Sequence, residues 1–89
     1  MSVAEEIRRK LESGLEPQSL EIVDESHKHH GHSGWRPGGE THFRVDVVAT
    51  AFAGRSRVER QRLVYGLLAE ELAEKVHALA LKTRAPGEA

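Results

Sequence analysis

The first apolar pattern in the chain has helical spacing. Val3, Ile7 and Leu11 recur every four positions within a stretch rich in glutamate, arginine and lysine, so a helix here would have one apolar side and one charged side. Gly14 then offers a natural helix end, because glycine adopts the left-handed conformation of a C-terminal cap without strain. The pattern predicts a short amphipathic helix over residues 3–13.

Two later stretches alternate between apolar and polar residues, as strands with one buried face do. A short alternation predicts a strand over residues 19–25, and a longer one predicts a strand over residues 41–50. The second strand places Phe43, Val45 and Val47 on one face. Its opposite, polar face carries His42, Arg44 and Asp46. We expect the two strands to pair as an antiparallel hairpin.

The last third of the chain predicts a second helix and a third strand. Ser56 and Glu59 have the spacing of a capping box at the start of an amphipathic stretch, residues 57–73. The sequence VHALALKT, residues 76–83, has strand composition, and residues 84–89 form a polar tail that we expect to be frayed. The element order is αββαβ. We expect an α+β sandwich with two helices on one face of a three-stranded sheet.

Length and composition limit the class of protein. The 89 residues suffice for a single domain, residues 1–89, and 38% hydrophobic with 30% charged residues is typical of a globular protein. No apolar run approaches the roughly 18 residues of a membrane span, and charges near the N-terminus argue against a signal peptide, so we expect a cytoplasmic protein. The chain has no cysteine and a net charge of −1. These values exclude disulfides, thiolate metal sites of its own and a global attraction to nucleic acid.

The segment between the two predicted strands is rich in histidine and glycine. Residues 26–39 read SHKHHGHSGWRPGG, without apolar periodicity, which predicts a long flexible loop. The loop contains His27, His29, His30 and His32. Neutral imidazole binds borderline metals, so His29 and His32, three positions apart, could hold one ion. The alternative is a solvated loop with no pre-organised site, since no carboxylate of the loop would orient the rings.

A further histidine opens the third predicted strand. His77 alternates with Leu79 and Leu81, which would place it on their face, at the rim of the sheet. A lone histidine there is more often a buried structural residue than a ligand. Both interpretations stay open, because a neutral imidazole is also what a metal ion requires.

Four arginines gather where the second predicted helix begins. Arg55, Arg57, Arg60 and Arg62 surround a single acidic residue, Glu59. Such a cluster binds phosphate groups or is merely solvated. The sequence has no nucleophile paired with a base, no carboxylate pair on one strand face and no glycine-rich phosphate loop. We therefore expect no catalytic residues and a protein that is not an enzyme.

Several motifs together resemble the BolA family, and they cover nearly the whole chain in that family's order and spacing. They are DES at 24–26, GGETHFRV at 38–45, FAG at 52–54, RQRLVYGLLAEEL at 60–72 and VHALALKT at 76–83. The chain is identified as a member of this family, and its histidine-rich loop resembles that of alphaproteobacterial and plant members. The resemblance implies an αββαβ fold like that of class II KH domains. One departure is Gln61, which stands where the family's RHR motif has histidine.

The resemblance implies a partner and a cofactor. BolA proteins bind monothiol glutaredoxins, and the two proteins share a [2Fe-2S] cluster that is also held by a glutaredoxin cysteine and a glutathione thiol. On this chain the resemblance assigns one ligand to His77 and the other to the loop, at His29 or His32, with His27 and His30 behind them. The isolated protein, a monomer or weak dimer, would hold no cluster. The implied role is an adaptor in iron–sulfur cluster trafficking or iron sensing.

The resemblance also implies an alternative function, that of a DNA-binding transcription regulator in stress response and cell morphology. On this chain a KH-like surface would then bind the nucleic acid through the arginine cluster, Arg55, Arg57, Arg60 and Arg62.

Overall fold

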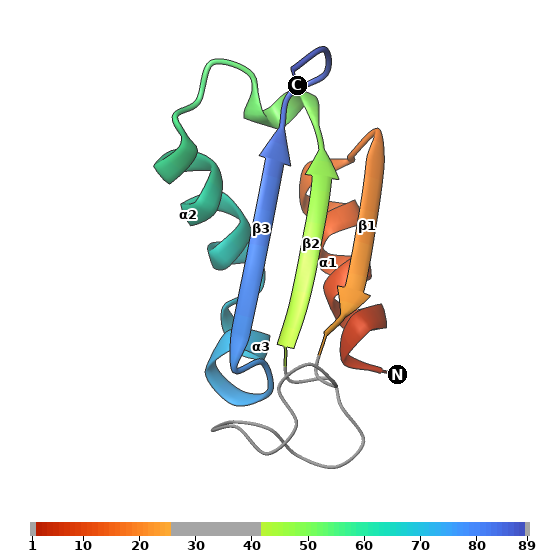
Figure 1. The fold of residues 1–89 in the computed structure, drawn as a ribbon. Coiled ribbons are helices and arrows are strands. Elements are labelled where there is room, and N and C mark those ends of the chain that lie inside the picture. The colour runs from red at the N-terminus through yellow and green to blue at the C-terminus, as the bar shows by residue number, and fades with distance from the viewer. Residues whose placement is uncertain (1, 26–41, 89) are drawn as a thin grey trace.

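The computed structural model describes residues 2–25 and 42–88. In chain order the elements are α1 (Val3–Leu15), β1 (Ser19–Asp24), β2 (His42–Val48), the short 3-10 helix η2 (Thr50–Phe52), α2 (Arg57–Leu67), α3 (Ala69–Glu74) and β3 (Ala78–Arg84) (Figure 1). Each predicted helix and strand is present, with the second helix divided in two.

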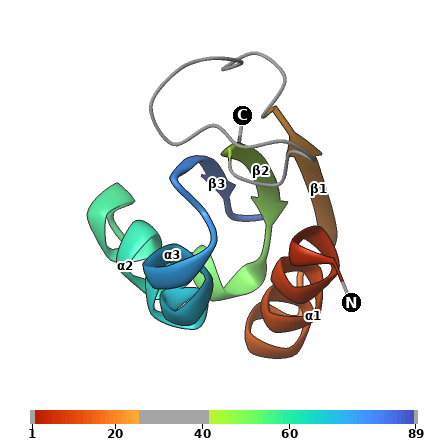
Figure 2. The same cartoon turned by 90° about the horizontal axis from the view of Figure 1, so that it is seen from below.

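The described strands form one sheet in the order β1-β2-β3. β1 and β2 pair antiparallel, as expected, with Ser19 opposite Val48. β3 pairs with β2 in parallel, and this register places Ala78 opposite His42 and Arg84 opposite Val48. α1, α2 and α3 all lie on one face of the sheet (Figure 2). The predicted α+β class is confirmed.

The core fills the space between the helices and the inner face of the sheet. Alternation along β2 directs Phe43, Val45 and Val47 into this layer, as predicted, and all three are buried. The side chains that meet them from the helices and η2 are Ile7, Leu11, Phe52, Val64 and Leu68. Burial of one such side chain contributes about 1.5–3 kcal/mol to folding. This packing holds the sheet against the helices and so positions the residues at both ends of the strands.

α1 begins where the sequence predicts and ends later. Oγ of Ser2 accepts a hydrogen bond from the Glu5 N–H at 3.1 Å and caps the first turn. At its other end the helix runs to Leu15, and the cap is Glu16, whose φ of 46° is left-handed. The prediction that Gly14 ends the helix is therefore wrong.

Gly14 is instead a point of close approach between α1 and α2. A Cβ atom on this residue would lie 2.6 Å from Cδ2 of Leu67, which is closer than packed carbon atoms sit. We expect Gly14→Val to destabilise the fold by about 1–3 kcal/mol through overpacking. Chemical denaturation measures this loss, which should shrink in a Leu67→Ala background because the space is then open. An equal loss in both backgrounds would contradict the contact.

The predicted second helix is divided at Leu68, where φ of −105° and ψ of 19° leave the helical range. Its start is as predicted: the Glu59 N–H donates to Oγ of Ser56 at 3.1 Å, and the Ser56 N–H donates to Oε1 of Glu59 at 2.8 Å. Leu68 is buried, so the bend keeps this side chain in the core while α3 turns towards α1. Tertiary packing here overrides the local helical pattern.

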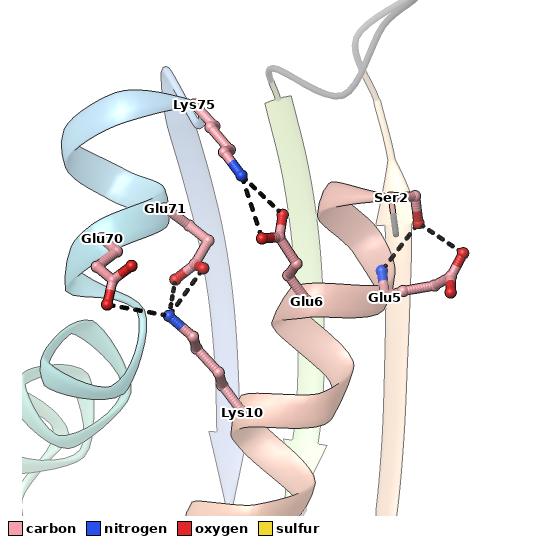
Figure 3. A network of polar contacts seen from close by, with 7 residues as sticks. All are labelled: Ser2, Glu5, Glu6, Lys10, Glu70, Glu71 and Lys75. Atoms are coloured by element: carbon pink, nitrogen blue, oxygen red, sulfur yellow. Dashed lines mark hydrogen bonds and ion pairs between the residues drawn. The ribbon is translucent and has the colours of Figure 1, made fainter.

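Ion pairs join α3 to α1 (Figure 3). Nζ of Lys10 donates to the two carboxylate oxygens of Glu71 at 2.9 and 2.8 Å, and the Glu71 side chain is only 3% exposed. Lys75 donates to both carboxylate oxygens of Glu6 at 3.1 Å in a more exposed position. Burial opposes ionisation of Glu71, but the Lys10 hydrogen bond, a backbone N–H and the nearby ammonium groups outweigh it, so the pKa of Glu71 lies below its usual value. α3 is therefore fixed to α1 by charge as well as by packing.

Candidate functional site

Two histidines meet at the end of the sheet where β2 and β3 begin. The parallel register pairs His42 with Ala78, so His77, immediately before β3, lies beside the first residue of β2. The two imidazole rings are 5.2 Å apart between centroids and inclined by 53°. His42 is 4% exposed, whereas His77 is exposed. The pair thus combines a buried ring with an accessible one.

The position of His77 corrects part of the sequence interpretation. β3 begins at Ala78, one residue after His77, and the His77 side chain is exposed. The expectation that His77 is buried is therefore wrong, because His77 precedes the strand and lies at the edge of the packed region. An exposed imidazole keeps a nitrogen lone pair available to a metal brought from outside the chain.

His42 is a site residue that sequence reasoning missed. Alternation along β2 assigns it to the polar face with Arg44 and Asp46, and the polar face of a small antiparallel sheet is usually solvated. Only the parallel pairing of β2 with β3 brings it to His77, and no local pattern carries that register. A signal was nevertheless present, since a histidine stands at the start of each of two predicted strands.

Glu25 and His42, the described residues on either side of the histidine-rich segment, lie at this same end of the sheet. These two residues are joined, because the Glu25 N–H donates to the His42 carbonyl at 2.7 Å. The candidate ligands His27, His29, His30 and His32 lie outside the described residues. Within residues 2–25 and 42–88, no group of three or more His, Cys, Asp or Glu side chains is arranged to hold a metal ion. His42 and His77 are therefore at most part of a ligand set.

A second polar region lies at the opposite end of β3, between this strand and the start of α2. It is a cleft of about 440 Å³, and its cationic lining residues are Arg55, Arg57, Arg60, Lys82 and Arg84. Of the predicted arginine cluster, Arg55, Arg57 and Arg62 are exposed, whereas the Arg60 side chain is only 12% exposed. The structure brings three of the four arginines to one cleft and leaves Arg62 outside its lining.

Arg60 is held from several sides. Its Nε donates to the Arg55 carbonyl at 3.0 Å, and its Nη1 donates to the Thr83 carbonyl at 3.3 Å. The Phe52 ring centroid lies 5.9 Å from the guanidinium carbon, within the range of a cation–π contact. Nη1 and Nη2 each donate to one carboxylate oxygen of Glu88, at 2.6 and 2.9 Å. Sequence reasoning could not find this bidentate pair, because nothing local connects residues so far apart.

Glu88, in the C-terminal tail of residues 84–89, contacts the chain at Ala85 as well as at Arg60. Ala85 is buried, and its N–H donates to Oε1 of Glu88 at 2.9 Å. The hydrogen bonds from Arg60 and from Ala85 lower the pKa of the Glu88 carboxyl to about 2. Glu88 is therefore ionised across the physiological pH range.

Comparison with known proteins agrees with the fold and with the motifs. A family model described as BolA-like protein matches residues 11–88. A protein of Sinorhizobium sp, described as an uncharacterized protein in the cobS 5' region, is 48% identical over 89 residues, which are 99% of this chain and 96% of that protein. The DNA-binding transcriptional regulator BolA of Escherichia coli (strain K12) is 43% identical over 93% of this chain and 75% of its own length.

A plant relative links the sequence match to a solved structure. SufE-like protein 1 of Arabidopsis thaliana is 45% identical over 86 residues, but the match spans only 23% of that protein. The solved BolA domain of SufE1 from Arabidopsis thaliana superposes with a TM-score of 0.89 at 44% identity, covering 100% of this chain and 98% of that domain. None of the helices in the described part of the chain is long and apolar enough to cross a membrane.

The fold, with its mixed sheet covered by helices on one face, is that of a BolA domain. The chain belongs to the BolA family, as the motifs in its sequence led us to expect.

Proposed function

We propose that this protein is a non-enzymatic adaptor that binds a monothiol glutaredoxin and contributes ligands to a [2Fe-2S] cluster shared with it. The observation that carries this proposal is the exposed His77 ring beside the buried His42 ring, with 5.2 Å between their centroids. The pair stands at the end of the sheet where Glu25 and His42 flank the histidine-rich segment in the sequence. A partner protein can approach His77 without any rearrangement of the core.

The residues present suit such a cluster. Histidine replaces cysteine as an iron ligand in Rieske-type [2Fe-2S] centres, and this chain offers histidines but no cysteine. Thiolates would then come from the glutaredoxin and from glutathione, while His77 and either His29 or His32 supply imidazole. A cluster so held supplies one-electron redox chemistry or transferable iron and sulfide, at a higher potential than all-thiolate ligation gives.

The geometry around His77 supports its proposed role as a ligand. Pairing of β2 with β3 fixes the backbones of His42 and Ala78 opposite each other, so the residue before Ala78 has a defined place. The buried His42 ring lies beside the His77 ring, with 5.2 Å between the two centroids. A ligand whose backbone is held in this way loses less conformational entropy when it binds. In this role the chain binds and orients, and it catalyses nothing.

Reconstitution tests the proposal. The chain is mixed with a monothiol glutaredoxin, iron, sulfide and glutathione, and visible absorption and circular dichroism are compared with those of the glutaredoxin alone. We expect a 1:1 complex with a new spectrum. An unchanged glutaredoxin spectrum and no complex on size exclusion would overturn the proposal. Transfer of the cluster to an apo-acceptor protein would then separate trafficking from sensing.

A second candidate function is sequence-specific or general DNA binding, as the name of the Escherichia coli relative suggests for that protein. The exposed Arg55, Arg57 and Arg62 favour it here, since Arg60 is engaged by Glu88. We expect Arg57→Ala and Arg62→Ala each to weaken DNA binding measured by fluorescence anisotropy. Each should also make the negative slope of log affinity against log salt concentration shallower by about 0.9, because one phosphate contact is lost. Absence of binding at low salt would eliminate this candidate.

A further inference from the structure

The cationic cleft between the start of α2 and the end of β3 is separate from the histidine pair. His77 precedes the first residue of β3, whereas Lys82 and Arg84 lie at the other end of the strand. A strand of this length spans about 20 Å. The cleft therefore has no part in the proposed cluster site, and any function of the cleft is a separate one.

Arg60 is a pre-organised anion receptor at the base of this cleft. Two backbone carbonyls, of Arg55 and Thr83, fix the guanidinium through Nε and Nη1. The remaining fork, Nη1 with Nη2, points at Glu88 and binds its carboxylate in a bidentate way at 2.6 and 2.9 Å. Phosphate oxygens fit the same fork. The Arg60–Glu88 pair thus has the geometry of a bound anion supplied by the chain itself.

The positive charge of the cleft exceeds what the chain neutralises. Glu88 pairs with Arg60, and Asp46 pairs with Arg84 at 2.9 Å. The other cations that line the cleft, Arg55, Arg57 and Lys82, form no ion pair within residues 2–25 and 42–88. Arg55 lies near Glu59 and, after the hydrogen bonds from Ser56, helps to lower the pKa of that carboxyl, whereas Arg57 and Lys82 form no ion pair among the described residues and favour a ligand with more negative charge than a carboxylate.

We propose that this cleft binds a small phosphorylated molecule through its phosphate groups, and that Glu88 occupies the Arg60 fork until a phosphate replaces it. The volume of about 440 Å³ lies in the range of small-molecule sites. The Arg60 side chain is 12% exposed, so its ligand has to enter the cleft, which favours a compact phosphate group. Arg57 and Lys82 would then contact the outer phosphate oxygens.

The test is a titration of the full chain with inorganic pyrophosphate as the probe. Two-dimensional NMR at low ionic strength monitors the binding. We expect saturable shifts of the backbone amides around Arg57 and Lys82. Glu88→Gln should tighten binding about two- to fivefold, as removal of one competing surface ion pair implies. Arg57→Gln and Lys82→Gln, both at exposed positions, should each weaken binding about threefold or more. Neither variant disturbs the core, so loss of binding would not reflect loss of fold.

The control is Arg9→Gln, which removes the same charge from an exposed position on α1. Unchanged binding in this variant supports a defined site. Equal weakening by Arg9→Gln and Arg57→Gln would overturn the proposal, because it would mean unspecific screening. Absence of binding in both the wild type and Glu88→Gln would also overturn it. The Arg60–Glu88 pair would then have a structural role only. If a single-stranded oligonucleotide displaced pyrophosphate and bound with higher affinity, the proposal would be overturned, and the ligand of the cleft would be nucleic acid instead of a small molecule.

Discussion

Replacing His77 by alanine should abolish the spectrum of the cluster that we propose this chain shares with a monothiol glutaredoxin, and it should leave the fold of this chain intact. The expectation follows from two properties of the side chain: it is exposed, and its ring contacts the buried His42 without filling the core. Loss of one of two imidazole ligands leaves an iron atom incompletely coordinated. Visible circular dichroism of the reconstituted mixture measures the loss, and thermal unfolding of the free variant checks the fold.

A ligand substitution provides the matched control. His77→Cys offers thiolate at the same position, so we expect a cluster to return with an altered, more thiolate-like spectrum. A His77→Ala mixture with the wild-type spectrum would eliminate His77 as a ligand. A cluster spectrum that is lost in His77→Ala and returns in His77→Cys would show that His77 acts as a ligand. Cysteine would not restore a merely structural contact.

Lys10→Met should destabilise the fold more than Lys75→Met, because the partner of Lys10 is the more deeply buried carboxylate. The Glu71 carboxylate is 3% exposed and receives both of its short contacts from Lys10. Removing the ammonium group leaves this buried charge without its main partner, and we expect a loss of about 2 kcal/mol in the free energy of unfolding. Urea denaturation at neutral pH measures it.

The neighbouring ion pair between the same two helices is the control. Lys75→Met breaks the contact to Glu6, in which the lysine side chain is 42% exposed, and should lower stability by at most about 1 kcal/mol. The double variant Lys10→Met with Glu71→Leu should recover part of the loss, because no buried charge then remains. Equal losses in Lys10→Met and Lys75→Met would contradict the importance of burial.

The Lys10→Met effect should depend on pH. In the wild type the folded-state pKa of Glu71 is below its usual value of 4.5. The pair therefore stabilises the fold above that value, and this contribution is lost as pH falls through the lowered pKa. In Lys10→Met the carboxyl is buried without its main partner, so protonation favours the variant. The difference in stability between the two proteins should vanish in acid and be full at neutral pH.

Local patterns were sufficient to predict the elements, but they could not predict the contacts between distant elements. Alternation placed Phe43, Val45 and Val47 correctly in the core, because the two-residue period of a strand is a local property. Gly14 was misread as a helix end, since its reason for being glycine is Leu67, a residue of another helix. The same limit explains why the break at Leu68 was not expected from the helical period.

The same distinction between local patterns and distant contacts holds for the candidate sites. The family resemblance pointed to His77 as a candidate ligand, and residue type and spacing pointed to the arginine cluster. They did not reveal His42 as the neighbour of His77, since that contact depends on the parallel register between β2 and β3. Nor could they reveal that Glu88 engages Arg60, which requires the tail to fold back on α2.

The parallel pairing of β2 with β3 also has a consequence for how the protein is made. A chain emerging from the ribosome can join α1, β1 and β2 early, because these elements are close in sequence, but β3 is added only after α2 and α3 have been synthesised. His77 and the cleft residues Lys82 and Arg84 arrive with that strand. We expect both sites to appear together at the final step of folding. A chain cut before β3 would carry neither site and would expose the unpaired edge of β2, which favours aggregation and degradation over partial function.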